Sequence, residues 1–552
     1  MQILSSLKKI DISLTQFNLL IACWLAAGLN ISFFKKVSEL GSYTGALSYL
    51  FVFATFVLLA GFYFFVLQLI NWKHTAKVLS AVLIFLGGGA AYFVNQLGAE
   101  INRTQMENVA QTDLHETLDL ITAAPFVLWF IGMVILPLII LFFLKIKPAT
   151  FKRTIFTKLI TLVLALVCMS GVLFSFYGEY APIFREHREL KSKITPLNVL
   201  SGGLSYIKTQ FHHNKKQQPL VRYGEDAHMV VNAASKQPKI LVVVVGETAR
   251  AQNFSLNGYP KLTNPELSKL DIINFSNASS CGTQTSVSVP CMFSGMPRHD
   301  YDEGLAAHRE GLLDIVQRAG YKVTWIDNNS GCKGACDRIQ TYISPKDDAR
   351  YKQWCEDGEC KDQVLLEALR DYLKTLDLKQ LKQNQLIVLH QVGSHGPAYY
   401  KRYPEEFKKF TPTCDTNNIQ NCDHNSLINT YDNTIVYTDH ILATLIQDLK
   451  QLPIATGMMY MSDHGESTGE SGMYLHGAPY MMAPKEQTHI PMIFWFSQQW
   501  PQQTALRSCL SQQQKSAVSQ DNLFPTVLGL LDIQTQVLNP KLNMVQNCQG
   551  QN

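Results

Sequence analysis

The fold of the C-terminal part of this chain is decided by the stretch KILVVVVGET at residues 239–248. After Lys239 the run is wholly apolar and rich in β-branched side chains, which is typical of a strand covered on both faces. The run then changes abruptly to Gly246-Glu247-Thr248, so a carboxylate stands where the strand ends. A buried strand with a polar end predicts an α/β domain whose chemistry lies at the edge of a sheet.

Alternating strand and helix patterns continue around this stretch, from about residue 237 to the C-terminus. Amphipathic helix patterns such as VLLEALRDYLKTL separate further buried-strand runs, which are YKVTWID (321–327), QLIVLHQV (385–392), TGMMYMSD (456–463) and THIPMIFWF (488–496). Elements that alternate in this way predict an α/β sandwich with a mostly parallel sheet. Residues 237–552 are therefore expected to form one globular domain.

The ends of these strands carry metal-ligand side chains. QLIVLHQV is followed by Gly393-Ser394-His395-Gly396, TGMMYMS by Asp463-His464-Gly465-Glu466, and His476 lies in a later loop. Carboxylates and imidazoles bind zinc, or manganese and magnesium where oxygen predominates. Taken singly, Glu247 and Asp463 also fit helix-start or turn carboxylates, and the histidines fit hydrogen-bonded loop residues. Several such sites at strand ends favour one shared metal site.

A nucleophile is expected in the segment SSCGTQTSVSVPCMFSG at residues 279–295. It offers four hydroxyls, on Thr283, Thr285, Ser286 and Ser288. A hydroxyl at a helix N-terminus meets N–H groups that favour an anion such as phosphate, and a metal can lower the pKa of the hydroxyl. The alternative is a Ser/Thr-rich turn closed by a disulfide.

The first third of the chain has the composition of a membrane domain. The whole sequence is 47% hydrophobic and only 17% charged, and its net charge of +4 gives no support for nucleic-acid binding. Five apolar stretches each approach the roughly 20 residues that a spanning helix needs. We expect a transmembrane domain over residues 1–177, with spans at about 14–34, 48–70, 78–98, 121–144 and 157–177.

Basic residues in the short loops predict the orientation of these spans. Three loops on one side are positive, through Lys8, Lys9, Lys73, Lys77, Lys145, Lys147, Lys152 and Arg153, whereas Lys35 and Lys36 lie on the other side. The positive side is expected to be cytoplasmic, so everything after about residue 178 lies outside the cytoplasm. Residues 178–236 are expected to form a connector whose first half fits a helix on the membrane surface and a solvated linker helix equally well.

The cysteines support this placement. Of the 12 cysteines, Cys23 and Cys168 lie inside predicted spans, and the other ten follow residue 280 and are mostly close together in pairs. An even number of closely spaced cysteines is typical of an oxidising compartment. The alternative is a zinc site that uses Cys332, Cys336, Cys355 and Cys360.

Four motifs resemble those of a known family. They are VGETAR (245–250), CGTQTSVSVPC (281–291), GSHGP (393–397) and SDHGES (462–467). They are similar to motifs of the lipid A phosphoethanolamine transferases, which include the mobile colistin-resistance enzymes and belong to the alkaline-phosphatase-like hydrolase superfamily. The resemblance implies a membrane domain of five transmembrane helices and a soluble α/β sandwich of the alkaline phosphatase/sulfatase type.

The resemblance also implies roles for individual residues. Glu247, Thr285, Asp463 and His464 would hold one zinc ion, with Thr285 as the nucleophile. His395 and His476 would bind the transferred phosphate or a second zinc, and the substrate would also meet Glu466, Asn329, Ser330 and Lys333. In the outside loop, Asn108, Thr112 and Glu116 match positions near the opening for lipid.

The implied reaction moves phosphoethanolamine from phosphatidylethanolamine to a phosphate of lipid A through a phospho-threonine and releases diacylglycerol. It would take place in the periplasm, at the inner membrane of a Gram-negative bacterium, on a monomeric enzyme, and would confer resistance to polymyxins such as colistin. Two alternatives stay open, which are a phosphoglycerol transferase or sulfatase-like hydrolase of the same superfamily, and a non-enzymatic membrane receptor.

Sequence proximity favours five disulfides, and the first of them would hold the Thr285 segment rigid. The favoured pairs are Cys281–Cys291, Cys332–Cys336, Cys355–Cys360, Cys414–Cys422 and Cys509–Cys548.

Overall fold

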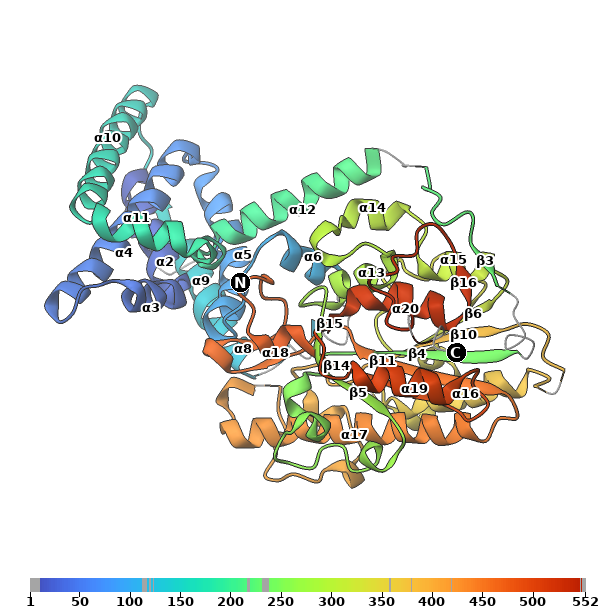
Figure 1. Cartoon of the computed structure of the whole chain (residues 1–552). Coiled ribbons are helices and arrows are strands. Elements are labelled where there is room, and N and C mark those ends of the chain that lie inside the picture. The colour runs from blue at the N-terminus through green and yellow to red at the C-terminus, as the bar shows by residue number, and fades with distance from the viewer. Residues whose placement is uncertain are drawn as a thin grey trace. The chain divides into compact units, whose positions relative to one another are not determined.

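The structure, a computed structural model, describes residues 10–111, 117–118, 121–122, 124–215, 219–230, 238–356, 359–378, 380–417, 419–546 and 548. These residues divide into two compact units. The helical unit lies within residues 1–109 and 121–210, and the sheet unit lies within residues 110–120 and 211–552. Figure 1 shows the helices of the first unit in blue to teal and the mixed second unit in green to red.

Four long apolar helices of the helical unit are able to cross a membrane. They are α4 (Ala46–Ile70), α5 (Ala76–Gln96), the stretch Ala124–Phe143, and α10 (Phe151–Ser175). The stretch Ala124–Phe143 consists of α8 (Ala124–Phe130), a π-helical turn (Ile131–Ile135) and α9 (Leu136–Phe143). These helices match the last four predicted spans, and their outward apolar side chains, such as Phe174 and Leu128, are exposed as lipid contact requires.

The first predicted span, 14–34, is not one straight helix. It is α2 (Leu14–Leu29) followed by α3 (Ile31–Leu40), and the two are bent by 67° at Asn30. The buried Asn30 side chain explains the break, because its amide donates to the carbonyls of Leu25 and Thr195, and its oxygen accepts from the Thr195 N–H. The polar side chain thereby bonds to one carbonyl of the last turns of α2 and ties the bend to the distant Thr195 backbone. The described part of the chain therefore has five spans only if the bent pair counts as one.

The predicted connector, residues 178–236, contains most of α11 (Tyr177–Glu186), the helix α12 (Leu197–Lys215) and the short strand β3 (His228–Met229). The boundary between the two compact units falls near residue 210, inside α12.

An eight-stranded sheet forms the sheet unit, in the order β15-β5-β14-β11-β4-β10-β6-β7. The central strands are β11 (Ala455–Ser462), β4 (Lys239–Gly246), β10 (Gln385–His390) and β6 (Lys322–Asp327), and each is parallel to its neighbour. Next to them, β14 (His489–Phe496) is antiparallel to both β11 and β5 (Ile273–Ser279). The edges are β7 (Thr341–Ile343) and β15 (Val518–Ser519). The mostly parallel sheet agrees with the alternating sequence pattern.

Both faces of this sheet are covered, which is why β4 is apolar at nearly every position. Successive β4 residues alternate between two buried clusters, so Leu241, Val243 and Val245 pack on one face and Ile240, Val242 and Val244 on the other. Helices α13 (Thr285–Ser294), α15 (Leu312–Arg318) and α20 (Leu523–Leu530) supply the first cluster, and α16 (Gln363–Lys374) and α17 (His424–Lys450) supply the second.

The register places the polar strand ends side by side. Gly246 of β4 pairs with Ser462 of β11, and His390 of β10 pairs with both Val245 and Asp327. The residues that follow these pairs are therefore the ones that meet at the carboxyl edge of the sheet.

The sheet unit contains five disulfides, and they are the pairs that sequence proximity favours. The bonded pairs are Cys281–Cys291, Cys332–Cys336, Cys355–Cys360, Cys414–Cys422 and Cys509–Cys548. The free cysteines of the described residues are Cys23 and Cys168 in the helical unit. The alternative of a zinc site on Cys332, Cys336, Cys355 and Cys360 is wrong, because these sulfurs are bonded to one another.

Candidate active site

Glu247, Asp463 and His464 converge at the carboxyl edge of the sheet. Glu247 directly follows β4, Asp463 and His464 are the two residues after β11, and their ligand atoms all lie within 4.8 Å of one another. His464 Nε2 is 3.2 Å from Glu247 Oε1 and 3.3 Å from Asp463 Oδ2. His464 Nδ1 lies 2.9 Å from the Gly465 carbonyl oxygen, which leaves Nε2 to face the carboxylates. The three side chains are at most 1% exposed.

Thr285 adds its hydroxyl to this cluster. It is the first residue of α13, directly after Gln284, and its Oγ1 donates to Glu247 Oε2 over 3.0 Å. The same oxygen is 3.3 Å from His464 Nε2. The hydroxyl thus lies at the start of a helix, where unpaired N–H groups stabilise negative charge, and beside the predicted metal ligands.

The other three hydroxyls of the segment are engaged elsewhere or lie deeper. Thr283 Oγ1 donates to the Ala478 carbonyl, and Ser286 Oγ accepts from the Gln284 side chain. Ser288 is fully buried inside α13. Among the four candidates, the hydroxyl with bonds to the carboxylate cluster is that of Thr285.

The acidic cluster has the donor chemistry that a metal ion requires. Glu247 Oε1 and Asp463 Oδ2 are buried, and within the described part of the chain neither accepts a hydrogen bond. Burial and the nearby Glu247 raise the pKa of Asp463 to about 7. Burial also acts to raise the pKa of Glu247, but the close contact with His464 and the charge of that ring lower it. Two buried carboxylates, one imidazole and one hydroxyl therefore supply the donor atoms that a bound cation needs.

A second group of polar residues lies beside the first. The His476 ring centroid is 4.6 Å from that of His464 and 5.2 Å from that of His395. His476 Nδ1 is 3.2 Å from Glu466 Oε1, while Glu466 Oε2 is buried and without a hydrogen bond among the described residues. Burial lowers the pKa of His395 to about 3, so its ring is neutral. The structure thus brings together the three predicted substrate-side residues from separate loops.

Asn329 lies closer to the predicted metal ligands than its substrate-side assignment indicates. Its side-chain amide donates to Glu247 Oε2 over 2.7 Å and to the Gln391 carbonyl over 2.8 Å. Its oxygen accepts from the Ser330 N–H, and Lys333 Nζ donates to the Ser330 carbonyl over 3.1 Å. Asn329 therefore orients the Glu247 carboxylate, and Ser330 and Lys333 continue the same loop.

The structure describes one of the three residues predicted near the opening for lipid. Asn108 lies on α6 (Arg103–Gln111) of the helical unit, and Thr112 and Glu116 lie outside the described residues. Their role stays a prediction.

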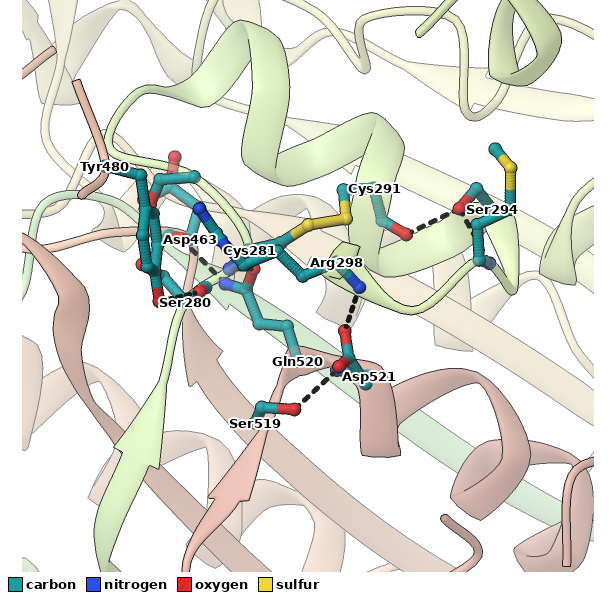
Figure 2. Close-up of a disulfide and its surroundings, with 12 residues drawn as sticks. Ser280, Cys281, Cys291, Ser294, Arg298, Asp463, Tyr480, Ser519, Gln520 and Asp521 are labelled. Carbon is teal, nitrogen blue, oxygen red and sulfur yellow. Dashed lines mark hydrogen bonds between the residues drawn. A yellow bond between two sulfur atoms is a disulfide. The ribbon is translucent and has the colours of Figure 1, made fainter. Parts of the chain in front are cut away.

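Sequence reasoning missed a side chain that links the segment before Thr285 to Asp463. The buried Gln520 accepts from the Cys281 N–H over 2.7 Å and donates to the carbonyls of Ser462 and Asp463 over 2.9 and 2.6 Å. Figure 2 shows the amide end of Gln520 next to Asp463 and Cys281, and Cys281 forms the disulfide with Cys291. No motif marks a lone glutamine far along the chain, so only the fold could reveal this position.

A buried histidine–carboxylate pair was also missed. His390 Nδ1 lies 2.8 Å from Asp327 Oδ1, at the ends of β10 and β6. Burial acts to raise the pKa of Asp327, but the His390 hydrogen bond and charge lower it to about 2. The same rule that singled out other polar strand ends could have found this pair.

Comparisons with known proteins match both halves of the chain. Residues 59–211 match the family model described as Phosphoethanolamine transferase EptA/EptB, and residues 239–533 match the Sulfatase family model. The chain is similar to phosphoethanolamine transferase EptA of Salmonella typhimurium, with 42% identity over 96% of each chain. It is also similar to phosphatidylethanolamine transferase Mcr-1 of Escherichia coli, with 36% identity over 93% of this chain and 94% of the relative.

A solved structure shares the whole architecture. The integral membrane protein lipooligosaccharide phosphoethanolamine transferase A of Neisseria meningitidis superposes with a TM-score of 0.91 at 36% identity, over 98% of this chain and 99% of that one. This likeness extends over both units. On these grounds the chain belongs to the EptA family of phosphoethanolamine transferases.

Proposed function

We propose that this protein transfers phosphoethanolamine from phosphatidylethanolamine to a phosphate of lipid A. The observation that carries the proposal is the Thr285 hydroxyl, which lies at a helix start within hydrogen-bond distance of Glu247 and close to His464. The family membership supports phosphoethanolamine as the transferred group, and the relatives include Mcr-1. The added ammonium group would lower the negative charge of lipid A and weaken the binding of cationic peptides such as polymyxins and colistin.

In the first half-reaction Thr285 Oγ1 attacks the donor phosphorus. Glu247 Oε2 already accepts the Thr285 hydrogen bond, so this carboxylate is placed to receive the proton. A bond forms between Oγ1 and phosphorus, and the bond from phosphorus to the diacylglycerol oxygen breaks. One proton leaves Thr285 and one is needed by the leaving oxygen, so the step balances. The N-terminal N–H groups of α13 stabilise the charge on the phosphoryl oxygens.

In the second half-reaction a lipid A phosphate oxygen attacks the phospho-threonine. The bond from phosphorus to Thr285 Oγ1 breaks, and Oγ1 takes up the proton that the attacking lipid A phosphate loses. A covalent intermediate lets two bulky lipids use one site in turn. The chain carries its own membrane spans, so both lipids are reached from the bilayer in which the protein resides.

Glu247, Thr285, Asp463 and His464 are proposed to hold one zinc ion. Their oxygen and nitrogen donors suit a tetrahedral zinc site, and the orphaned buried carboxylate oxygens support it. When bound, zinc supplies Lewis-acid stabilisation of the reacting oxygens. His395, His476 and Glu466 are proposed to bind the transferred phosphoethanolamine or a second zinc, and Ser330 and Lys333 to line its path.

The protein is a multi-pass membrane protein of the bacterial inner membrane, and its sheet unit lies in the periplasm. The related Neisseria protein is an integral membrane protein, and a related domain from Campylobacter jejuni is described as periplasmic. The five disulfides of the sheet unit fit that oxidising compartment.

Mass spectrometry of the full-length protein after incubation with phosphatidylethanolamine tests the proposal. We expect phosphoethanolamine on Thr285, no transfer in Thr285→Ala, and partial transfer in Thr285→Ser, which keeps the hydroxyl but loses the β-branch that fixes its rotamer. Ser286→Ala is the matched control. An adduct on Thr283 or Ser286, or lipid A that gains phosphoglycerol instead, contradicts the assignment.

Zinc in the protein by elemental analysis and loss of transfer with chelator test the metal.

A further inference from the structure

The loop that follows His476 is fastened to the segment that carries Thr285. The Gly477 N–H donates to the Thr283 carbonyl over 2.8 Å, and Thr283 Oγ1 donates back to the Ala478 carbonyl over 2.7 Å. These two bonds lie two residues before the proposed nucleophile. A displacement of the loop therefore reaches the Thr285 segment directly.

Tyr480 anchors the next part of the loop. Its hydroxyl donates to the Ser280 carbonyl over 2.8 Å, and the Arg298 guanidinium lies 3.3 Å from the centroid of its ring. Figure 2 shows Tyr480 and Ser280 together beside the Cys281–Cys291 disulfide, with Arg298 close by. Among the described residues Arg298 Nε makes no hydrogen bond. The guanidinium and the Tyr480 ring thus form a cation–π contact.

The tip of the loop presents two methionines to solvent. Met481 is 96% exposed, the highest value for a large hydrophobic side chain among the described residues, and Met482 is 39% exposed. The tip is closed by bonds from the N–H groups of Met482 and Ala483 to the Pro479 carbonyl, over 2.8 and 2.9 Å. Exposed apolar side chains at a loop tip lose their unfavourable hydration when an apolar surface covers them.

We infer that this tip, defined as residues 479–483, docks on the phospholipid bilayer. Met481 and Met482 enter the apolar boundary of the membrane, and Arg298 meets the lipid phosphates. The pairing of an apolar tip with a cation held on an aromatic ring is the chemistry of an interfacial anchor. The chain itself spans a bilayer, so this surface is available to the sheet unit without another partner. The inference deepens the proposed function, on which it rests, by naming the surface from which the site takes its lipids.

Membrane depth is the first test, and it does not depend on activity. The full-length protein would carry Cys23→Ala and Cys168→Ala, which remove the free thiols and leave the disulfides intact. A spin label is then attached at Met481→Cys, or at the control Leu262→Cys, which is also exposed and apolar but lies in a different loop. In nanodiscs of phosphatidylethanolamine and phosphatidylglycerol we expect the label at 481 to meet dissolved oxygen more than an aqueous nickel chelate. The label at 262 should show the reverse.

Transfer from bilayer lipid is the second test. Met481→Ser with Met482→Ser removes most of the apolar tip, and we expect the surface concentration of phosphatidylethanolamine needed for half-maximal transfer to rise about tenfold or more. Leu262→Ser should leave it unchanged. Arg298→Gln keeps a polar side chain but removes the charge, and it should produce a smaller rise that high salt reproduces in the parent protein.

The two tests separate this inference from the proposed function. Equal aqueous exposure of the labels at 481 and 262 overturns the docking inference whether or not transfer occurs. Unchanged transfer in the double methionine variant also overturns it. If the parent protein shows no transfer while the label at 481 lies in the membrane, the docking surface stands and the proposed function fails.

Discussion

Gly393 lies against the backbone of Glu247. A Cβ atom on Gly393 would come 2.5 Å from the Glu247 carbonyl oxygen and 3.0 Å from its nitrogen, and the φ of Gly393 is +51°. Asp362 holds this glycine by accepting its N–H over 2.9 Å, and the next N–H, of Ser394, donates to the Glu247 carbonyl over 3.0 Å. The loop that carries His395 and the end of β4 are therefore in direct contact through a residue without a side chain.

Gly393→Ala is expected to displace Glu247 and so to abolish transfer and lower the metal content. Gly320→Ala is the matched control, because Gly320 has a φ of +95° and its Cβ would meet nothing within 4 Å. Both substitutions carry the left-handed strain of about 1–2 kcal/mol, but only the first adds a backbone clash. Elemental analysis and transfer assays on both variants decide, and a Gly393→Ala protein with normal zinc and activity contradicts the prediction.

Gln520→Leu is expected to weaken the site while the fold survives. The change introduces an apolar side chain of similar size and removes the partner of one N–H and two carbonyls, at a cost of about 1–3 kcal/mol for each buried group that stays unsatisfied. We expect a large fall in metal affinity and transfer rate but only a small fall in melting temperature. Gln513→Leu is the control, since Gln513 also bonds to backbone carbonyls but lies near the C-terminal disulfide. Equal losses in the two variants would show that Gln520 has only a general structural role.

Asp327→Asn is expected to destabilise the sheet unit in a pH-dependent way. The buried carboxylate pairs with His390 and accepts from the Trp325 indole and the Gly331 N–H. Breaking a buried charged pair costs about 3–5 kcal/mol. The lowered pKa of Asp327, about 2, makes its contribution present above an unfolded value of about 3.9 and lost as pH falls towards 2.

The pKa of His390, the partner of Asp327, sets the upper end of the pH range in which the charged pair stabilises the fold. Burial acts to lower the pKa of His390, but the hydrogen bond and charge of Asp327 raise it. A raised pKa gives stability below about 6.5 that is lost as pH rises through the folded value. The difference in melting temperature between the parent protein and Asp327→Asn should therefore be largest between about pH 4 and 6.5. A difference that is flat from pH 4 to 9 argues against a charged pair, and His390→Gln should remove the decline on the alkaline side.

Thiol counting tests the disulfides and the periplasmic placement together. Of the 12 cysteines, ten are bonded, so the denatured, unreduced protein should take up two maleimide groups, on Cys23 and Cys168. After reduction it should take up twelve. Intact mass before and after reduction gives both numbers, and adducts on Cys281 or Cys291 without reduction would contradict the oxidising placement.

The sequence by itself determined those parts of the protein that depend on near neighbours along the chain. The apolar run 240–245 predicts a strand covered on both faces because its side chains alternate between two cores. Closely spaced cysteines predict their own pairing because short loops close at low entropic cost. The same local reasoning failed at Asn30, since its partner, the Thr195 backbone, is 165 residues away.

Only the tertiary structure decided how the separate strand ends meet. Register places Glu247 beside Asp463, 216 residues along the chain, and brings Asn329 to Glu247 across 82 residues. Packing of the loops also placed Gln520 in hydrogen-bond contact with Asp463 and Gly393 against Glu247. It left the Met481 side chain exposed at the tip of its loop. A local pattern states which residues are polar, whereas their distances and partners follow from strand pairing and packing over the whole unit.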